Sequence, residues 1–197
     1  MAHDDAFRVR FPEEESREPW LGLLLDAYAA LDAGLAAALA ADGRGPACRA
    51  GCAACCRQPI PASSLEVLGL TWYAHRHILG EKRRQVRRLL RRAARSRDCP
   101  FLVDDVCAAY PLRPMACREF LMLGSPCRAG EEPATSRPDD MLPLPLVAQR
   151  QAFWLMLPYY GVTDPAFRER ALADRLVLRD TGILQGRDWS WLVKILS

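Results

Sequence analysis

The sequence predicts a mainly α fold, a single helical domain over residues 1–197 with cysteine-rich metal-binding loops. Three observations lead to this prediction. Apolar residues recur every three or four positions in several long segments, as they do on the buried face of a helix. No segment alternates apolar and polar residues as a half-exposed strand does. Eight cysteines fall between residues 48 and 127, in stretches with too many prolines and glycines for continuous helices.

Length and composition favour one globular domain. The chain has 197 residues, of which 50% are hydrophobic and 26% are charged. This length is sufficient for one sizeable core and short for two, and the composition is that of an ordinary globular protein. The N-terminal residues are acidic and polar where a signal peptide would carry a basic start and an apolar stretch. We therefore expect a cytoplasmic protein.

The first predicted helix begins near Trp20 and ends near Gly43. This is the most apolar segment of the chain, but it contains Asp26 and Asp32, and carboxylates are costly inside a bilayer. We expect a core helix and no membrane span. Its apolar face consists of Leu21, Leu24, Leu25, Tyr28, Leu31, Leu35 and Leu39.

A loop and a second helix follow. Residues 44–61 contain several glycines and prolines, so the cysteines among them are expected on a loop or on one helical turn. Ser63 and Glu66 have the spacing of a capping box, which predicts a helix that begins there and ends near Leu79. His75 and His77 are two residues apart on this helix, so they point to different faces and cannot bind one ion together.

Residues 81–97 form a predicted amphipathic helix with a strongly basic face. The segment carries nine lysines or arginines, and the chain has a net charge of +3, so everything other than these nine positive charges, Glu81 included, carries 3 − 9 = −6. This asymmetry can attract an anionic partner, such as a nucleic acid, an acidic protein face or a membrane surface. A solvated helix face without a partner is an equally good interpretation. The apolar side consists of Val86, Leu89, Leu90, Ala93 and Ala94.

The last third of the chain begins with a predicted loop over residues 124–145, which are rich in proline, glycine, serine and aspartate. We expect this loop to cover the metal site. Helical patterns resume at residues 146–160, 166–178 and 189–196, and large apolar residues such as Phe153 and Trp154 indicate core helices.

The cysteines form two groups, Cys48, Cys52, Cys55 and Cys56 in the first and Cys99, Cys107, Cys117 and Cys127 in the second. Cytosolic thiols are kept reduced, which favours metal ligands or redox groups over disulfides. Thiolates are soft ligands that select zinc, copper(I) or iron–sulfur clusters. The prolines of the second group prevent one continuous helix, so the chain can return and bring these sulfurs to the first group. We expect one shared metal centre or two adjacent ones.

This pattern resembles the YkgJ-type cysteine-cluster family (CxxCxxCC), described as a zinc- or iron-chelating domain. The resemblance covers residues 48–120 and rests on Cys-x3-Cys-x2-Cys-Cys, followed by Cys-Pro-Phe-Leu, Cys-Ala-Ala-Tyr, Arg-Pro and Cys-Arg-Glu-Phe. Cys127 lies beyond the matched part and is interpreted either as an eighth ligand or as a free thiol. The resemblance implies that the metal-binding cysteines are Cys48, Cys52, Cys55, Cys56, Cys99, Cys107 and Cys117.

The identity of the metal is left open. Eight cysteines satisfy two closed four-thiolate zinc sites. The spacing of Cys48, Cys52 and Cys55 is that which holds a 4Fe-4S cluster in radical S-adenosylmethionine enzymes, whose barrel of strands and helices this chain lacks. One branch of the family, the flagellin lysine N-methylases, shares these motifs, uses S-adenosylmethionine and is considerably longer. The resemblance therefore implies the metal centre more strongly than the methylase reaction.

Three residues beside the cysteines are candidate cofactor-binding residues. Arg118 directly follows Cys117 and is expected to bond a cluster sulfur or a substrate carboxylate. Tyr110 and Arg113 are expected close to the same centre. Each has a structural alternative, because Arg113 can pair with a neighbouring aspartate, Asp104 or Asp105, and Tyr110 can close the core. No catalytic residue is assigned.

Two hypotheses follow. The first is an iron–sulfur or related iron centre that supports S-adenosylmethionine-dependent modification of a protein substrate. The second is a zinc-stapled interaction module whose basic helix binds an anionic partner. The sequence contains neither a phosphate-binding loop nor a dinucleotide-binding glycine motif, and its histidines do not have the spacing of a zinc protease.

Overall fold

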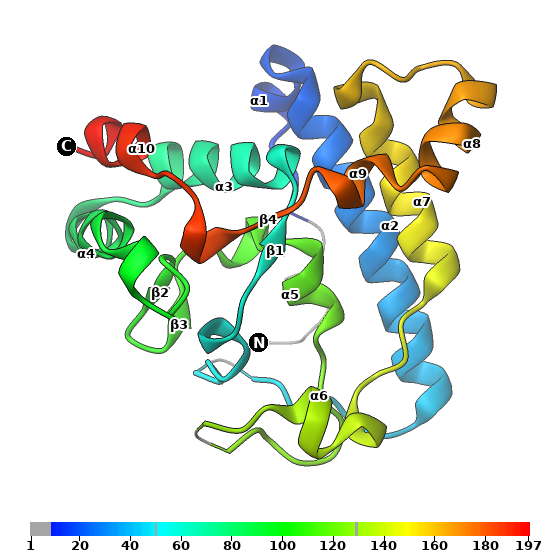
Figure 1. The fold of residues 1–197 in the computed structure, drawn as a ribbon, viewed down its shortest axis with the longest axis horizontal. Helices are drawn as coiled ribbons and strands as arrows, with labels where there is room; N and C mark the ends of the chain where they lie inside the picture. Colours follow the sequence, from blue (N-terminus) through cyan, green and yellow to red (C-terminus); the bar gives the residue numbers. More distant parts are fainter. Residues whose placement is uncertain (1–8, 50, 129) are drawn as a thin grey trace.

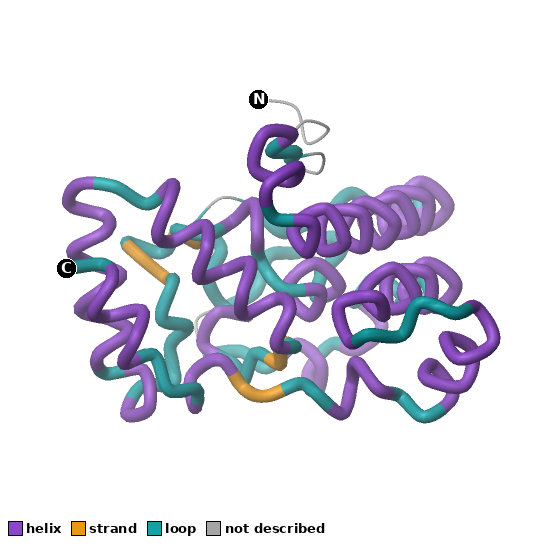
Figure 2. The backbone as a smooth tube through the Cα atoms, turned by 90° about the horizontal axis from the view of Figure 1, so that it is seen from above, coloured by secondary structure: helices purple, strands orange, loops and turns teal. Residues whose placement is uncertain are grey.

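The computed structural model describes residues 9–49, 51–128 and 130–197 and confirms the mainly α fold (Figure 1). The described part contains ten α-helices and two small two-stranded sheets. In Figure 2 the strands appear only as short orange segments between helices and loops. Residues 1–8 of the N-terminal segment on which the export prediction rests lie outside the described residues, as do Ala50 and Ala129.

Helix α2 (Pro19–Asp42) is the central helix of the first half and follows the short α1 (Pro12–Arg17). It ends as predicted at Gly43, whose φ of 78° is the left-handed conformation that glycine adopts readily. Helix α7 (Leu146–Met156) runs beside it (Figure 1). The two backbones approach closely at Gly34, where an added Cβ would lie 2.2 Å from Cβ of Ala148.

By length and composition α2 is able to cross a membrane. Its apolar face, however, is packed against the rest of the protein, with Leu21, Leu24 and Leu31 fully buried. Asp32 is also buried there and forms an ion pair inside the protein. Core packing therefore accounts for the buried apolar residues of this helix, whereas several of its alanines are exposed.

Helix α3 (Ser64–His77) begins with the predicted capping box. The Ser63 side chain accepts a hydrogen bond from the backbone N–H of Glu66, and the Glu66 carboxylate accepts one from the backbone N–H of Ser63. Helix α4 (Gly80–Arg91) is shorter than the predicted basic helix of residues 81–97. The chain leaves the α-helix at Arg92 and continues as a 3-10 turn, η3 (Ala93–Arg95), which buries Ala93.

The predicted helix at residues 166–178 is interrupted. Helix α8 (Pro165–Ala173) begins at Asp164, whose side chain caps it, and α9 (Leu176–Arg179) follows after a break. The break is at Arg175, which has a left-handed φ of 54°. This turn places Val177 in the core, where it is buried, so tertiary packing outweighs the helical pattern of the sequence.

The strands are two residues long, too short to show alternation in a sequence. Strand β1 (Pro61–Ala62) pairs antiparallel with β4 (Gly182–Ile183) near the C-terminus. Strands β2 (Leu102–Val103) and β3 (Val106–Cys107) form a hairpin whose turn residues, Asp104 and Asp105, both have positive φ. Aspartate tolerates this conformation, which two-residue hairpin turns favour.

The core has two parts, which share helix α3. One is formed by α2, α7 and one face of α3. The other is formed by the opposite face of α3, α4, the β2–β3 hairpin and helix α10 (Ser190–Ile195). Cys99 is buried in the second part, and Cys56, Cys107 and Cys117 pack against it. The remaining short helices are α5 (Met115–Glu119) and α6 (Pro133–Ser136); α6 lies within the predicted loop of residues 124–145.

Candidate metal centre

All eight cysteines line one cavity of about 630 Å³ and all are free thiols. The two groups predicted from the sequence are thus brought together, and no disulfide joins them. Cys127, which the sequence left undecided, lines the same cavity from the loop that precedes α6. Apolar side chains form much of the remaining wall, including Ile60, Leu70, Phe101 and Leu184.

The first cysteine group is attached to the segment that leads to Cys127. Pro46 forms a β-bridge with Leu123, and the backbone N–H of Ala47 donates to the carbonyl of Met122 at 2.7 Å. In return, the backbone N–H of Met122 donates to Sγ of Cys48 at 3.4 Å. These backbone contacts hold the loop of Cys48 beside the chain that carries Cys127.

The second group is attached to Cys56. The backbone N–H of Cys99 donates to the carbonyl of Cys56 at 2.7 Å, which joins the two cysteine loops directly. Cys107 lies on β3 of the hairpin, opposite Leu102. Cys117 lies on the short helix α5. A 3-10 turn, η2 (Cys55–Arg57), carries the adjacent pair Cys55 and Cys56.

Helix α5 has only five residues and is held by tertiary contacts at its start and in its body. At its start, the Glu66 carboxylate accepts a hydrogen bond from the backbone N–H of Met115 at 2.7 Å. In its body, Arg118 donates to Asp32 of α2 at 2.5 Å and to the carbonyls of Pro111 and Arg113 at 2.7 and 3.0 Å. These contacts determine where Cys117 lies.

The ion pair between Arg118 and Asp32 is almost completely enclosed, with side-chain exposures of 3% and 4%. Burial raises the pKa of Asp32, while the guanidinium of Arg118 acts in the opposite direction. The Arg118 guanidinium also lies 3.9 Å from the ring centre of Tyr28. Among the described residues, Oη of Tyr28 and Oδ1 of Asp32 are buried without a hydrogen-bond partner. Arg118 lines the cavity, but the hydrogen bonds of its guanidinium run to Asp32 and the backbone.

Tyr110 and Arg113, the two other predicted cofactor-binding residues, also line the cavity. The guanidinium of Arg113 lies 4.0 Å from the ring centre of Tyr110 and donates to the Tyr110 carbonyl at 3.1 Å. Tyr110 is 43% exposed, so it lies at the rim of the cavity and does not close the core. Asp105, one of the predicted partners of Arg113, pairs with Arg57 at 2.7 Å.

Burial favours the protonated form of several cavity thiols when no cation is bound. It raises the pKa of Cys99 to about 12 and also raises the pKa values of Cys107 and Cys117. For Cys127, burial followed by the charges of Cys52 and Cys48 raises the pKa to about 11. A metal ion that binds here must therefore displace protons from sulfur, which soft cations do readily.

The donor set fits a thiophilic metal. Its ligands are sulfur atoms, and neither His75 nor His77 lines the cavity. His77 packs instead among Phe11, Trp72 and Tyr73. Among the described residues, no three cysteine, histidine or carboxylate side chains already converge in the arrangement of a metal site. The cysteines are therefore gathered in one cavity, and a bound metal would draw their sulfur atoms closer together.

Sequence reasoning missed the residues that support Cys117. Glu66 was predicted only as a helix cap, and Asp32 only as a charge unfavourable for a membrane span. The signal that was available is the presence of charged residues on otherwise apolar helix faces, because such residues are rarely buried unless they are paired. Their partners come from chain segments far away in the sequence.

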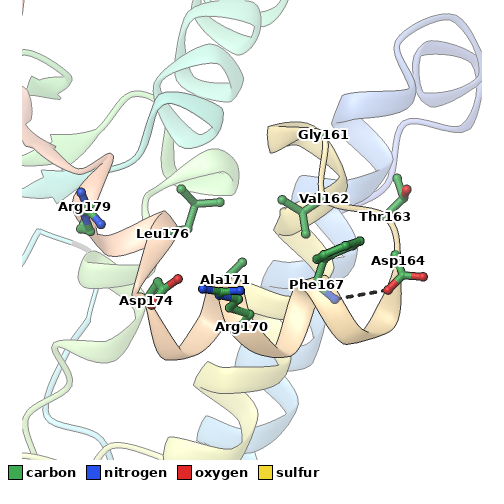
Figure 3. A pocket seen from close by; sticks show the side chains of 10 residues that line it. All are labelled: Gly161, Val162, Thr163, Asp164, Phe167, Arg170, Ala171, Asp174, Leu176 and Arg179. Atoms are coloured by element: carbon green, nitrogen blue, oxygen red, sulfur yellow. Dashed lines mark hydrogen bonds between the residues drawn. The ribbon is translucent and has the colours of Figure 1, made fainter.

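A second cavity, of about 610 Å³, lies between α8, α9 and the turn that precedes them (Figure 3). It contains no cysteine. Figure 3 shows Phe167 and Val162 on one side and Arg170 and Arg179 further along. Asp164 caps α8 through the backbone N–H of Phe167 at its edge. This cavity has none of the soft ligands of the cysteine site.

Comparison with known proteins identifies one family. Residues 47–139 match the family model CxxCxxCC, described as "Putative zinc- or iron-chelating domain". The match contains all eight cysteines and extends beyond the predicted motif core of residues 48–120. No curated protein and no solved structure matches the chain.

Proposed function

We propose that the CxxCxxCC domain to which residues 47–139 of this chain belong holds an iron–sulfur cluster in its cysteine cavity. The match of residues 47–139 to a zinc- or iron-chelating domain supports metal binding by this cysteine-rich region. The observation that carries the finer proposal is the presence of eight thiols around a single cavity of about 630 Å³. One metal ion with four ligands uses only half of these thiols.

The walls of the cavity support a cluster. Thiolates select iron–sulfur clusters and zinc over metals that prefer oxygen. The apolar side chains of Ile60, Leu70 and Phe101 exclude water from the inner side, and solvent exposure is one of the factors that determine the potential of a cluster. The buried position of Cys99 suits an inner ligand.

We extend the proposal to S-adenosylmethionine as a cofactor and a protein as the substrate. A cluster with an open iron would supply a Lewis acid for the amino and carboxylate groups of that cofactor. Arg113 offers a guanidinium to a carboxylate, and the half-exposed ring of Tyr110 offers a surface for the adenine at the cavity rim. Arg118 contributes through its neighbour Cys117, because its hydrogen bonds hold α5 in place.

A zinc-stapled module is the second candidate, and one observation favours it. The cysteine loops have little regular structure of their own, mainly η2, the two-residue strands of the hairpin and the five-residue helix α5. Metal binding would then supply part of the folding free energy, as it does in small zinc domains. Eight thiols are the number required by two closed zinc sites.

Metal analysis of one anaerobically purified sample tests the proposal. We expect a brown protein with a broad visible absorbance band, with iron and acid-labile sulfide in similar amounts. A colourless protein with about two zinc ions per chain and no sulfide would refute the cluster and support the zinc module. Reconstitution of the chelated protein with iron and sulfide or with zinc, in parallel, shows which product restores the melting temperature.

Cofactor binding is tested separately by calorimetric titration of the reconstituted protein with S-adenosylmethionine. Arg113→Ala should weaken binding at least tenfold. Arg150→Ala is the control, because Arg150 is an arginine that does not line the cavity and whose guanidinium pairs with Glu169. Equal affinities of the two variants would remove Arg113 from the proposed site without affecting the metal proposal.

A further inference from the structure

Helix α4 turns its apolar side into the protein. Val86 is fully buried and Leu90 is 4% exposed, and both belong to the second part of the core. A helix that lies on a membrane must insert an apolar face between the lipids. The apolar face of α4 is already occupied, so the membrane surface left open by the sequence is the least suitable partner.

Four of the nine basic residues of the predicted helix are engaged within the protein. Arg83 donates to the carbonyl of Ile195 at 3.0 Å, and Arg87 donates to the carbonyl of Val193 at 3.1 Å. Both carbonyls belong to the end of α10, beside α4 (Figure 1), where positive charge is favourable. The other two, Arg84 and Arg88, form ion pairs with Glu81.

A cluster of free charges remains at the end of α4 and in η3. We name the residues Arg91, Arg92, Arg95 and Arg97 the basic edge. All are exposed, and no ion pair involves any of them among the residues that the structure describes. Residues 91–97 expose no large apolar side chain between these arginines. One exposed acidic residue, Asp98, separates the basic edge from Cys99.

The composition of the basic edge distinguishes between the two remaining candidate partners, a nucleic acid and an acidic protein face. Protein interfaces rely on apolar and aromatic anchors that become buried at their centre, and the basic edge offers none. A phosphate backbone requires only positive charges and forked donors, which guanidinium groups supply. We propose that the basic edge binds the phosphate backbone of a nucleic acid without reading its sequence. Residues outside 81–97 carry a net charge of 3 − 8 = −5, because Glu81 lies within the segment, and this asymmetry turns this side of the molecule toward a polyanion.

Salt dependence measures the number of phosphate contacts. The test is fluorescence anisotropy of the full, metal-loaded chain with labelled DNA duplex, single-stranded DNA and single-stranded RNA. Four contacts to duplex DNA predict a slope of about −3.6 in log K against log salt, so affinity falls on the order of 10²-fold between about 50 and 200 mM salt. For single strands the predicted slope is about −2.8.

Two triple variants with the same change of charge provide the decisive comparison. Arg91→Gln with Arg92→Gln and Arg95→Gln should reduce the duplex slope to about −0.9 and weaken binding at low salt at least tenfold. The control, Arg170→Gln with Arg175→Gln and Arg179→Gln, removes three exposed arginines from α8, α9 and their connection. Glutamine keeps a high helix propensity. The control should bind like the unmodified chain.

Several results would overturn the proposal. These are equal weakening by both triple variants, an unchanged slope in the basic-edge variant, or binding to anionic vesicles or polyglutamate in the absence of nucleic acid binding. If the triple variant loses its native circular dichroism, the single variant Arg95→Gln replaces it, with an expected change of about 0.9 in the duplex slope. Metal content is measured on every sample, so loss of the metal centre and loss of the basic edge are distinguished.

Discussion

The buried ion pair between Arg118 and Asp32 provides the sharpest test of how the cysteine cavity is supported. Replacing Asp32 by Asn preserves the shape and an acceptor oxygen but leaves the Arg118 charge without a counter-charge in a site where the two side chains are only 3% and 4% exposed. Breaking such a pair from one side costs about 3–5 kcal/mol. We expect about 3 kcal/mol, the lower end, because one hydrogen bond is retained. That is on the order of 10²-fold in the ratio of folded to unfolded protein.

Urea unfolding of metal-loaded protein, followed by circular dichroism, measures this loss. The control is Glu169→Gln, which breaks the exposed pair of Glu169 with Arg150 and should cost less than about 1 kcal/mol. The Asp32 variant should also bind its metal more weakly, because the same arginine holds the helix that carries Cys117. A cost below about 1 kcal/mol for Asp32→Asn would refute the view that this pair supports the cavity.

Three further predictions concern packing, pH and metal removal. Gly34→Ala should destabilise the fold by about 1–3 kcal/mol because its Cβ would meet Ala148. On the same helix, Gly22→Ala would place its Cβ 3.8 Å from Oε2 of Glu15, an ordinary contact, and should stabilise the fold by up to about 1 kcal/mol in thermal unfolding. Burial acts to raise the pKa of Asp180, but hydrogen bonds from Ser64 and a tyrosine hydroxyl outweigh burial and hold this pKa below its ordinary value. The contribution of ionised Asp180 to the free energy of unfolding should be complete above about pH 4 and should be lost as the pH falls through the lowered pKa of the folded state. Asp180→Asn should abolish this part of the pH dependence of the free energy of unfolding, as measured by unfolding at a series of acid pH values. Complete removal of the metal by a chelator should lower the melting temperature by several degrees while most helical circular dichroism persists, because helices α2 and α7 pack without help from the cysteines. An unfolded apo-protein would contradict this prediction and favour the zinc-stapled module.

The helices were predictable where local signals agree with packing. The apolar repeat of α2 and the capping box of α3 are confirmed, since both depend on residues close together in the sequence. The break at Arg175 and the early end of α4 were not predictable. In both cases the chain leaves a favourable helical pattern in order to bury a residue, Val177 or Ala93, in a core made by distant segments.

The gathering of the cysteines was predictable, but the residues that support them were not. Cysteine is rarely used in such numbers without a role for its sulfur, so the spacing alone predicted a shared centre. Cys127 required the structure, because a trailing cysteine carries no local signal of where its loop returns. The second hydrogen bond of Glu66, to Met115, joins residues 49 positions apart, and no sequence pattern indicates it.

By itself, then, the sequence determined the mainly helical class, the soft character of the candidate metal ligands and the basic segment after α3, because composition and short-range spacing decide each of them. Only the tertiary structure decided which arginines of that segment are free, how Arg118 is used and that all eight cysteines face one cavity. The physical reason is that burial, ion pairing and the closing of loops depend on contacts between residues far apart in the chain. Such contacts are absent until the helices have packed.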